Sequence, residues 1–294
     1  MKKWKWLPVL LAGLLLAGGC GSTGTEKKTT DTGKKTVIAA TEGMVRPVSY
    51  VGKDGQLTGY EVEVLKAAAK KAGYDIKFEK TEFASIFAGI DSGRYQIGFG
   101  SLNKTPQREE KYTFAKVPHY YEPAGFFVTK GTLAKHPIKK IEDLGGLTTY
   151  TNPKGESWQQ FVEAFNKQYP DNPIILKYSD EDWGAYYRRL NTGDGMNLLK
   201  GMESRIKLYA DEYGYHYDYV SLPQSELDKV SKLADPYKWF IYAKTDEGRK
   251  IAADFDKALK ELQEDGTLSK LSQKWLGNDF SSKENYDKAH AQKQ

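Results

Sequence analysis

Residues 95–115 read YQIGFGSLNKTPQREEKYTFA. The apolar run 95–100 ends in glycine and is typical of a buried strand, followed by small polar residues and an arginine. Upstream, the same criteria predict strands at 36–41 and 75–81 and helices at 60–73 and 83–93. The resulting β-α-β-α-β order indicates a parallel sheet with helices on both faces.

The alternation of strands and helices returns downstream and predicts a second α/β lobe in tandem. Its strands are expected at 146–151, 173–179, 196–202 and 217–222, and its helices at 156–168, 181–193 and 203–214. Segment 238–244 then predicts one more strand. Two helices follow at 249–266 and 267–277, the second with Thr267 as its N-cap. The fold class is therefore α/β with two lobes.

The N-terminal segment reads as a secretory signal. A basic start, MKKWKW, precedes the apolar run LPVLLAGLLLAGG and then Cys20. Such a run is too short for a membrane span. A cysteine directly after small residues resembles the lipobox of bacterial lipoproteins, although Ala17 stands where Leu is usual. We expect a signal peptide at 1–19, lipid attachment at Cys20, a flexible tether at 20–35, and a location on the extracytoplasmic face of the cell membrane.

Composition excludes several classes of function. Cys20 is the sole cysteine, so the folded body has no disulfide, thiol nucleophile or thiolate metal site. The net charge is +5, with basic and acidic residues interspersed, which argues against nucleic-acid binding. No metal-ligand spacing and no phosphate-binding Gly-Lys-Ser/Thr motif occurs, so we expect neither metal nor cofactor. The last residues, 281–294, read as a polar tail.

Two strand ends define the expected binding crevice. In open α/β sheets ligands bind beyond the carboxyl ends of the strands, here at 41–43 and 100–103. Thr105 can cap a helix that begins at Pro106. Arg108 would then present a two-pronged donor suited to a carboxylate near that helix start. The alternative for Arg108 is a surface ion pair with Glu109 or Glu110.

Three stretches together resemble a known family, the extracytoplasmic solute-binding proteins of ABC-type amino-acid importers. They are RPVSYVGKDGQLTGYEVEV, TEFASIFAGIDSGRYQIGFGSLNKTPQREEKYTFA and DKALKELQEDGTLSKLSQKWLG, and the resemblance covers about 37–277. It implies a type 2 periplasmic-binding-protein fold, in which two lobes joined by crossing strands close on a ligand. By this resemblance lobe 1 is 36–121 plus 237–280 and lobe 2 is 122–236.

The resemblance also implies roles for residues of lobe 1. Arg108 would grip the ligand α-carboxylate. Ser101 and Asn103 would hold the charged ends of an amino acid, the alternative being simple turn chemistry. Phe83 matches an aromatic residue that covers the ligand, the alternative being a core position on a helix face.

Two residues of the first strand-end loop are further candidates. Glu42 matches an acidic position that can accept an ammonium group or a polar side chain. Arg46 stands near a place where the family often has an aromatic residue, which favours a ligand with a polar or second charged end. Its alternative is a solvated loop residue.

Lobe 2 departs from the family pattern. Its candidates are Gly155, Ser157 and Trp158, of which Trp158 has the spacing of a core residue. The family's Asp for the ligand ammonium group is missing, because Met196 or Asn197 stands at that position. A buried ammonium group needs an acceptor, and the possible substitutes are Asn197, Glu42, Asp182 and Asp235.

The function that follows is a non-catalytic substrate-binding subunit of an ABC importer. It would capture an amino acid, cystine or another polar one, between the lobes as a monomer. It would deliver this ligand to a permease driven by a separate ATPase subunit. Two alternatives are a dehydratase-like enzyme on the same fold, with Glu42 as its acid, and a surface adhesin.

Overall fold

A computed structural model describes residues 33–151, 157–181, 183–230 and 236–291, without the side chains of 157 and 183. Residues Lys34–Gln294 form one compact unit, to which the following account refers. Cys20, Gly155, Asp182 and Asp235 lie outside the described residues.

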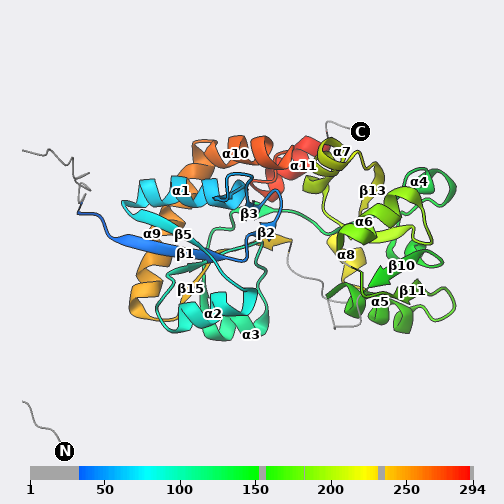
Figure 1. Cartoon of the computed structure of the whole chain (residues 1–294), viewed down its shortest axis with the longest axis horizontal. Coiled ribbons are helices and arrows are strands. Elements are labelled where there is room, and N and C mark those ends of the chain that lie inside the picture. The colour runs from blue at the N-terminus through cyan, green and yellow to red at the C-terminus, as the bar shows by residue number, and fades with distance from the viewer. Residues whose placement is uncertain (1–32, 152–156, 182, 231–235, 292–294) are drawn as a thin grey trace, which may run out of the picture. The chain divides into compact units, whose positions relative to one another are not determined.

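A five-stranded sheet organises the first half of the chain (Figure 1). Strand β1 (Thr36–Thr41) lies between β5 (Asp75–Lys80) and β6 (Ile97–Gly98) and is parallel to both. Strand β15 (Ile241–Ala243) returns from late in the chain and pairs antiparallel with β6 and with β7 (Tyr112–Phe114). The sheet is therefore mixed rather than wholly parallel, and β6 is shorter than the run 95–100 predicts.

The two faces of this sheet carry separate apolar layers. Residues Val37 and Ala39 of β1 belong to the core under α1 (Tyr60–Ala72), α9 (Asp246–Glu264) and α10 (Thr267–Leu276). Ala40, the next residue along, faces the layer formed with α2 (Phe83–Asp91). This division follows from the two-residue period of a strand. It places helices on both faces, as the sequence predicts (Figure 1).

The starts and stops of the long helices follow local signals. Helix α1 ends at Gly73, whose φ of 79° suits a left-handed C-cap. Thr245 caps α9 by accepting a hydrogen bond from the Gly248 N–H. The prediction for α10 is wrong by one residue, because Gly266 is its N-cap and Thr267 already lies in the helix.

Residues 125–230 build a second set of sheets around their own core. Strand β9 (Gly125–Thr129) lies between β12 (Leu198–Gly201) and β13 (Tyr217–Ser221), antiparallel to both. Strands β10 (Thr148–Thr151) and β11 (Ile175–Tyr178) form a parallel pair. The helices packed here are α5 (Ser157–Gln168), α6 (Trp183–Thr192) and α7 (Ile206–Tyr213).

Two short strands connect these halves. Strand β8 (Tyr120–Tyr121) pairs antiparallel with β14 (Tyr237–Lys238). The rings of Tyr121 and Tyr237 lie 4.9 Å apart. Segment 238–244, predicted as one strand, is thus divided between β14 and β15.

Short elements complete the chain. They are β2 (Met44–Val45), β3 (Ser49–Val51), β4 (Leu57–Thr58), α3 (Pro106–Lys111), α4 (Thr132–Lys135), α8 (Gln224–Leu227) and α11 (Lys283–Ala291), with 3-10 turns at Ile141–Leu144 and Glu203–Arg205. The last helix differs from the expected polar tail. Tyr286 on α11 is buried and packs 5.4 Å from Tyr121. His290 Nε2 of the same helix lies 2.7 Å from the Glu203 carboxylate. These contacts dock the helix, and a single aromatic residue in a polar segment is too weak a signal to predict them.

Candidate ligand-binding site

The loops that follow β1 and β6 lie in contact. The N–H of Phe99 donates to the Ala40 carbonyl at 3.1 Å, and a Cβ on Gly100 would stand 3.0 Å from the Thr41 hydroxyl oxygen. Gly100 has a φ of 130°, which an L side chain rarely adopts. Glycine is therefore required here both by the backbone and by the close approach of Thr41.

The buried carboxylate of Glu61 holds the backbone of Ser101. Ser101 has a φ of 58°, in the left-handed region. Its N–H donates to the Glu61 carboxylate at 2.9 and 3.2 Å, and its hydroxyl lies 2.8 Å from that of Tyr120. The backbone N–H of Ser101 is thus already used within the protein. Its hydroxyl has further capacity, since it can both donate and accept.

Glu61 forms a buried pair with His119. Both side chains are fully buried, and His119 Nε2 lies 2.7 Å from the Glu61 carboxylate. The imidazole also stacks on Phe240 at 3.9 Å. Burial lowers the pKa of His119, although the bond to Glu61 acts in the opposite direction. A neutral imidazole whose Nε2–H donates to the Glu61 carboxylate fits this arrangement, and that carboxylate in turn holds the Ser101 N–H.

Arg108 stands at the end of the same loop. Thr105 caps α3 by accepting from the Arg108 N–H at 3.2 Å, with Pro106 in the first turn as expected. The guanidinium donates to the Asn103 carbonyl at 3.0 Å. Within the described part of the chain, Arg108 forms no ion pair with Glu109, Glu110 or another carboxylate. Burial lowers its pKa, yet a guanidinium stays charged.

Phe83 is the exposed neighbour of Arg108. It begins α2, is 41% exposed, and its ring lies 5.6 Å from the Arg108 guanidinium carbon. Phe87 lies under the same group at 5.2 Å. Phe83 is therefore not a core residue, and its exposed ring stands beside the Arg108 guanidinium.

Glu42 and Arg46 differ in whether their charged groups already have a partner among the described residues. Glu42 is half-buried and has no hydrogen bond or ion pair with the described residues. Arg46 instead binds the Glu212 carboxylate through Nη1 at 2.7 and 2.9 Å and stacks on Tyr50 at 4.3 Å. Arg46 is therefore neither a solvated loop residue nor a free cation.

Trp158 lies in the core of the second half, which was the alternative to a ligand contact. It is 1% exposed, stacks on Phe161 at 5.5 Å, and its ring N–H donates to the Thr149 hydroxyl at 3.0 Å. Ser157 is the first residue of α5, as its expected position at a helix N-terminus requires.

Met196 and Asn197 stand where the family has the Asp that binds the ligand ammonium group, and both make contacts within the protein. Met196 is buried in the core, and Asn197 Oδ1 accepts from the Thr148 N–H at 2.6 Å. That oxygen joins β10 to the start of β12. Asn197 is accordingly occupied, which leaves Glu42 as the described acidic candidate.

A cavity of about 1230 Å³ begins at Glu42 and extends over the second half. Glu42, Met44 and Arg46 line it from one side, and Trp158 is the candidate residue on the other. Ser101, Asn103, Arg108 and Phe83 are not part of its lining. Its further lining includes Glu181, Tyr187, Arg188, Lys200, Arg205 and Tyr209.

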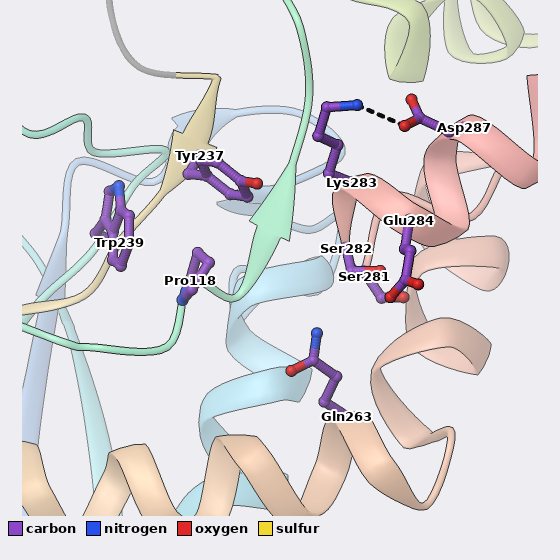
Figure 2. Close-up of a pocket in the computed structure, with 9 residues that line it drawn as sticks. All are labelled: Pro118, Tyr237, Trp239, Gln263, Ser281, Ser282, Lys283, Glu284 and Asp287. Atoms are coloured by element: carbon purple, nitrogen blue, oxygen red, sulfur yellow. Dashed lines mark hydrogen bonds and ion pairs between the residues drawn. The ribbon is translucent and has the colours of Figure 1, made fainter.

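A second hollow of about 630 Å³ lies elsewhere, near the crossing strands (Figure 2). Tyr237 and Trp239 stand on one side and residues of α11 on the other. Lys283 and Asp287 pair with each other at 2.5 Å. None of the residues expected to bind a ligand lines this hollow, and it is not the candidate site.

Sequence reasoning did not single out Glu61 and His119, which support the Ser101 loop, or the cavity-lining cations Lys200 and Arg205. Glu61 belongs to the Gly-Tyr-Glu pattern already noted, but an acid at a helix start is usually a solvated, dipole-matched residue. Nothing local marks Lys200 or Arg205. Their proximity to the cavity follows from the packing of β12 and the turn after it.

Known proteins place this architecture in a family. The model of the bacterial extracellular solute-binding proteins, family 3, matches residues 37–278. The L-cystine-binding protein TcyJ of Bacillus subtilis is 28% identical over 283 residues, which are 96% of this chain and 98% of that protein.

Solved structures agree. A structure from a study of glutathione import through GshT and the cystine ABC importer TcyBC of Streptococcus mutans is 32% identical, with a TM-score of 0.67, over 85% of this chain and 98% of that one. The L-cystine solute receptor of Neisseria gonorrhoeae, in its unliganded open conformation, is 25% identical with a TM-score of 0.65, over 85% and 96% of the two chains.

The chain therefore belongs to the bacterial extracellular solute-binding proteins of family 3. Its fold is that of the type 2 periplasmic-binding proteins, and its function is to bind a solute. In the described part of the chain, no helix combines the length and apolarity that crossing a membrane would need. No group of three or more potential metal ligands occurs there either.

Proposed function

We propose that this protein is the substrate-binding subunit of an ABC-type amino-acid importer and that it captures cystine or another polar amino acid. The observation that carries the proposal is Arg108, a half-buried guanidinium beside two aromatic rings and without a carboxylate partner among the described residues. A cation so placed favours a carboxylate ligand, because a guanidinium binds a carboxylate with two parallel hydrogen bonds.

The ligand's amino-acid end would lie between the two strand-end loops. Arg108 takes the α-carboxylate, with the Ser101 hydroxyl and Asn103 beside it. Glu42 takes the ammonium group in place of the family's missing Asp. Phe83 covers the ligand, and burial between the lobes supplies the apolar part of the binding energy.

The remaining parts of the proposal concern the cellular setting. Lobe 1 is 36–121 plus 237–280, lobe 2 is 122–236, and they move about the crossing strands. Cys20 carries the lipid that holds the protein on the extracytoplasmic face of the membrane, through the tether 20–35. The protein acts as a monomer and delivers its ligand to a permease and ATPase.

Binding without catalysis is supported by how the histidines are used. His119 is buried against Glu61, His136 Nε2 lies 2.5 Å from the Asp143 carbonyl, and His290 Nε2 lies 2.7 Å from Glu203. None of these three forms a hydrogen bond or an ion pair with Glu42. Turnover of a prephenate-like substrate that is lost in Glu42→Gln would contradict this part.

A thermal unfolding screen tests the proposal. The protein is heated with each common amino acid, with L-cystine and with glutathione. A ligand at 100 times its Kd stabilises the folded state by about 2.7 kcal/mol and raises Tm by several degrees. We expect L-cystine or another polar amino acid to do so. The proposal falls if no compound of the panel changes Tm and calorimetry detects no binding.

A further inference from the structure

The cavity on lobe 2 carries more positive than negative side chains. Two of its charged residues are already matched, since Arg46 pairs with Glu212 and Glu181 pairs with Arg189 at 2.7 Å. Among the lining residues this leaves Arg188, Lys200 and Arg205 against the carboxylate of Glu42.

Lys200 and Arg205 are neighbours whose charges repel. Lys200 is half-buried on β12 and forms no hydrogen bond or ion pair with the described residues. Burial lowers the pKa of Lys200, and the positive charge of Arg205 lowers it further. An unmatched ammonium group beside a guanidinium is costly in a partly dry cavity unless an anion joins them.

Arg205 also has donor capacity to spare. One of its Nη atoms donates to the Tyr187 hydroxyl at 3.3 Å and its side chain also bonds Tyr209, whereas its buried Nε–H has no hydrogen-bond partner among the described residues. The nearby carboxylate of Glu122 contributes favourable charge; its Oε1 accepts from the Ser204 N–H at 2.9 Å, and its Oε2 has no hydrogen-bond partner among the described residues. Buried donors of native proteins are normally satisfied, so an unsatisfied one indicates a missing acceptor.

Two further features of the cavity are its aromatic walls and its volume. The rings of Tyr187 and Tyr209, both cavity-lining, lie 4.5 Å apart beside Arg205. A volume of about 1230 Å³ exceeds the 300–1,000 Å³ or so of typical small-ligand pockets. A single small amino acid would leave most of such a volume empty.

We propose that Lys200 and Arg205 form an anion subsite for a second carboxylate at the far end of the ligand. The substrate class is then an amino acid or short peptide that is two-ended, with one carboxylate for Arg108 and another for this subsite. The inference rests on the proposed function, because it takes the first end of the ligand to lie at the Arg108 loop.

Matched ligand pairs test the subsite by isothermal titration calorimetry. The first pair is L-cystine and its mono-amide; the second is glutathione and its glycine-terminal amide. Each amide keeps the size of the parent compound and removes one negative charge, and the amino-acid end remains free for Arg108. We expect the wild-type protein to bind the parent compound at least about tenfold more tightly than the amide.

Substitutions of Lys200 and Arg205 test whether these residues cause the preference for the parent compound. In Lys200→Gln and in Arg205→Gln, the two members of a pair should bind within about threefold of each other. The control is Lys207→Gln, an exposed lysine on α7 whose partner is Asp211; this variant should keep the full preference. If a variant fails to fold, the comparison of parent and amide on the wild-type protein decides by itself.

The outcomes separate this inference from the proposed function. Equal binding of parent and amide by the wild-type protein overturns the subsite while the amino-acid role stands. Binding of a monocarboxylate amino acid, with neither parent compound bound, also overturns it. Absence of binding by every amino acid and peptide overturns the proposed function itself.

Discussion

Arg108 is the residue on which the binding account depends. We expect Arg108→Ala to weaken amino-acid binding roughly 100-fold, because truncating one partner of a buried, hydrogen-bonded charge pair costs about 3 kcal/mol. Calorimetric titration measures the loss. The matched control is Arg94→Ala, whose exposed guanidinium pairs with Glu79 at 3.1 Å and should leave Kd unchanged. Equal affinities of the wild-type protein and Arg108→Ala would remove the proposed carboxylate grip.

His119 makes the free energy of unfolding depend on pH. Because burial lowers its pKa in the folded protein, the unfolded chain takes up a proton at a pH where folded His119 stays neutral. Its contribution is present above the unfolded pKa of about 6.5 and is lost as the pH falls toward the lowered folded pKa, by at most about 1.4 kcal/mol per pH unit.

Urea unfolding at pH 7.5 and pH 5.5 measures this effect, with His119→Gln as the comparison. The variant should lose less stability between these two pH values than the wild-type protein does. The comparison is needed because burial raises the pKa of Glu122, which acts with the opposite sign as the pH rises above about 4.5. Equal losses in both proteins would show that His119 does not titrate as described.

The turn between α9 and α10 shows how one carboxylate connects elements. Asp265 accepts from the Thr267 N–H at 3.0 Å and pairs with Lys71 of α1 at 3.0 Å. These bonds lower the pKa of Asp265 to about 2. We expect its NMR titration midpoint near that value and a higher midpoint in Lys71→Ala.

The contribution of the Asp265 carboxylate to the free energy of unfolding is present at neutral pH. It is lost as the pH falls through the folded pKa of about 2. Asp265→Asn should therefore unfold more easily than the wild-type protein at pH 7 and approach it at the acid end of the range. A midpoint at the ordinary Asp value would mean that neither bond persists in solution.

Elements with strong local signals could be predicted from the sequence, and pairings between distant segments could not. Helix α1 and the Thr105–Pro106 start of α3 follow from apolar spacing, capping residues and glycine. By contrast, β15 joins its sheet antiparallel after a long excursion of the chain. Helix α11 docks through Tyr286 alone among its buried residues.

The candidate site divides in the same way. The helix start in the Arg108 loop depends on consecutive residues, so it could be predicted from the sequence. The Glu61–His119 pair and the hydrogen bond to the Asn197 oxygen form between residues that are far apart in the sequence. The pattern of a single sequence does not indicate such contacts. Trp158 has the helical spacing of a core residue, and the structure buries it in the core at the edge of the cavity that it also lines.

At the scale of the whole molecule, the ion pair between Arg46 and Glu212 joins the segment after β2 to helix α7 at the edge of the cavity that Arg46 lines. In the proposed site, Glu212 competes with a ligand's charged end for this cation. We expect Glu212→Gln to tighten binding of a dicarboxylate ligand by up to about fivefold, in line with the roughly 0.2–1 kcal/mol of a half-exposed pair.

Asp211→Asn is the matched control, because Asp211 pairs with Lys207 within α7. It should leave Kd unchanged in the same calorimetric titration. Weaker binding in Glu212→Gln would mean that the pair supports the bound form rather than competing with the ligand.

The most direct test of the central claim is a crystal structure of the protein grown with L-cystine or with whichever amino acid the thermal screen identifies. The account predicts ligand density between the lobes, with the α-carboxylate about 3 Å from the Arg108 guanidinium and the ammonium group beside Glu42. A well-ordered ligand that binds elsewhere, or in the cleft without touching Arg108, would contradict it.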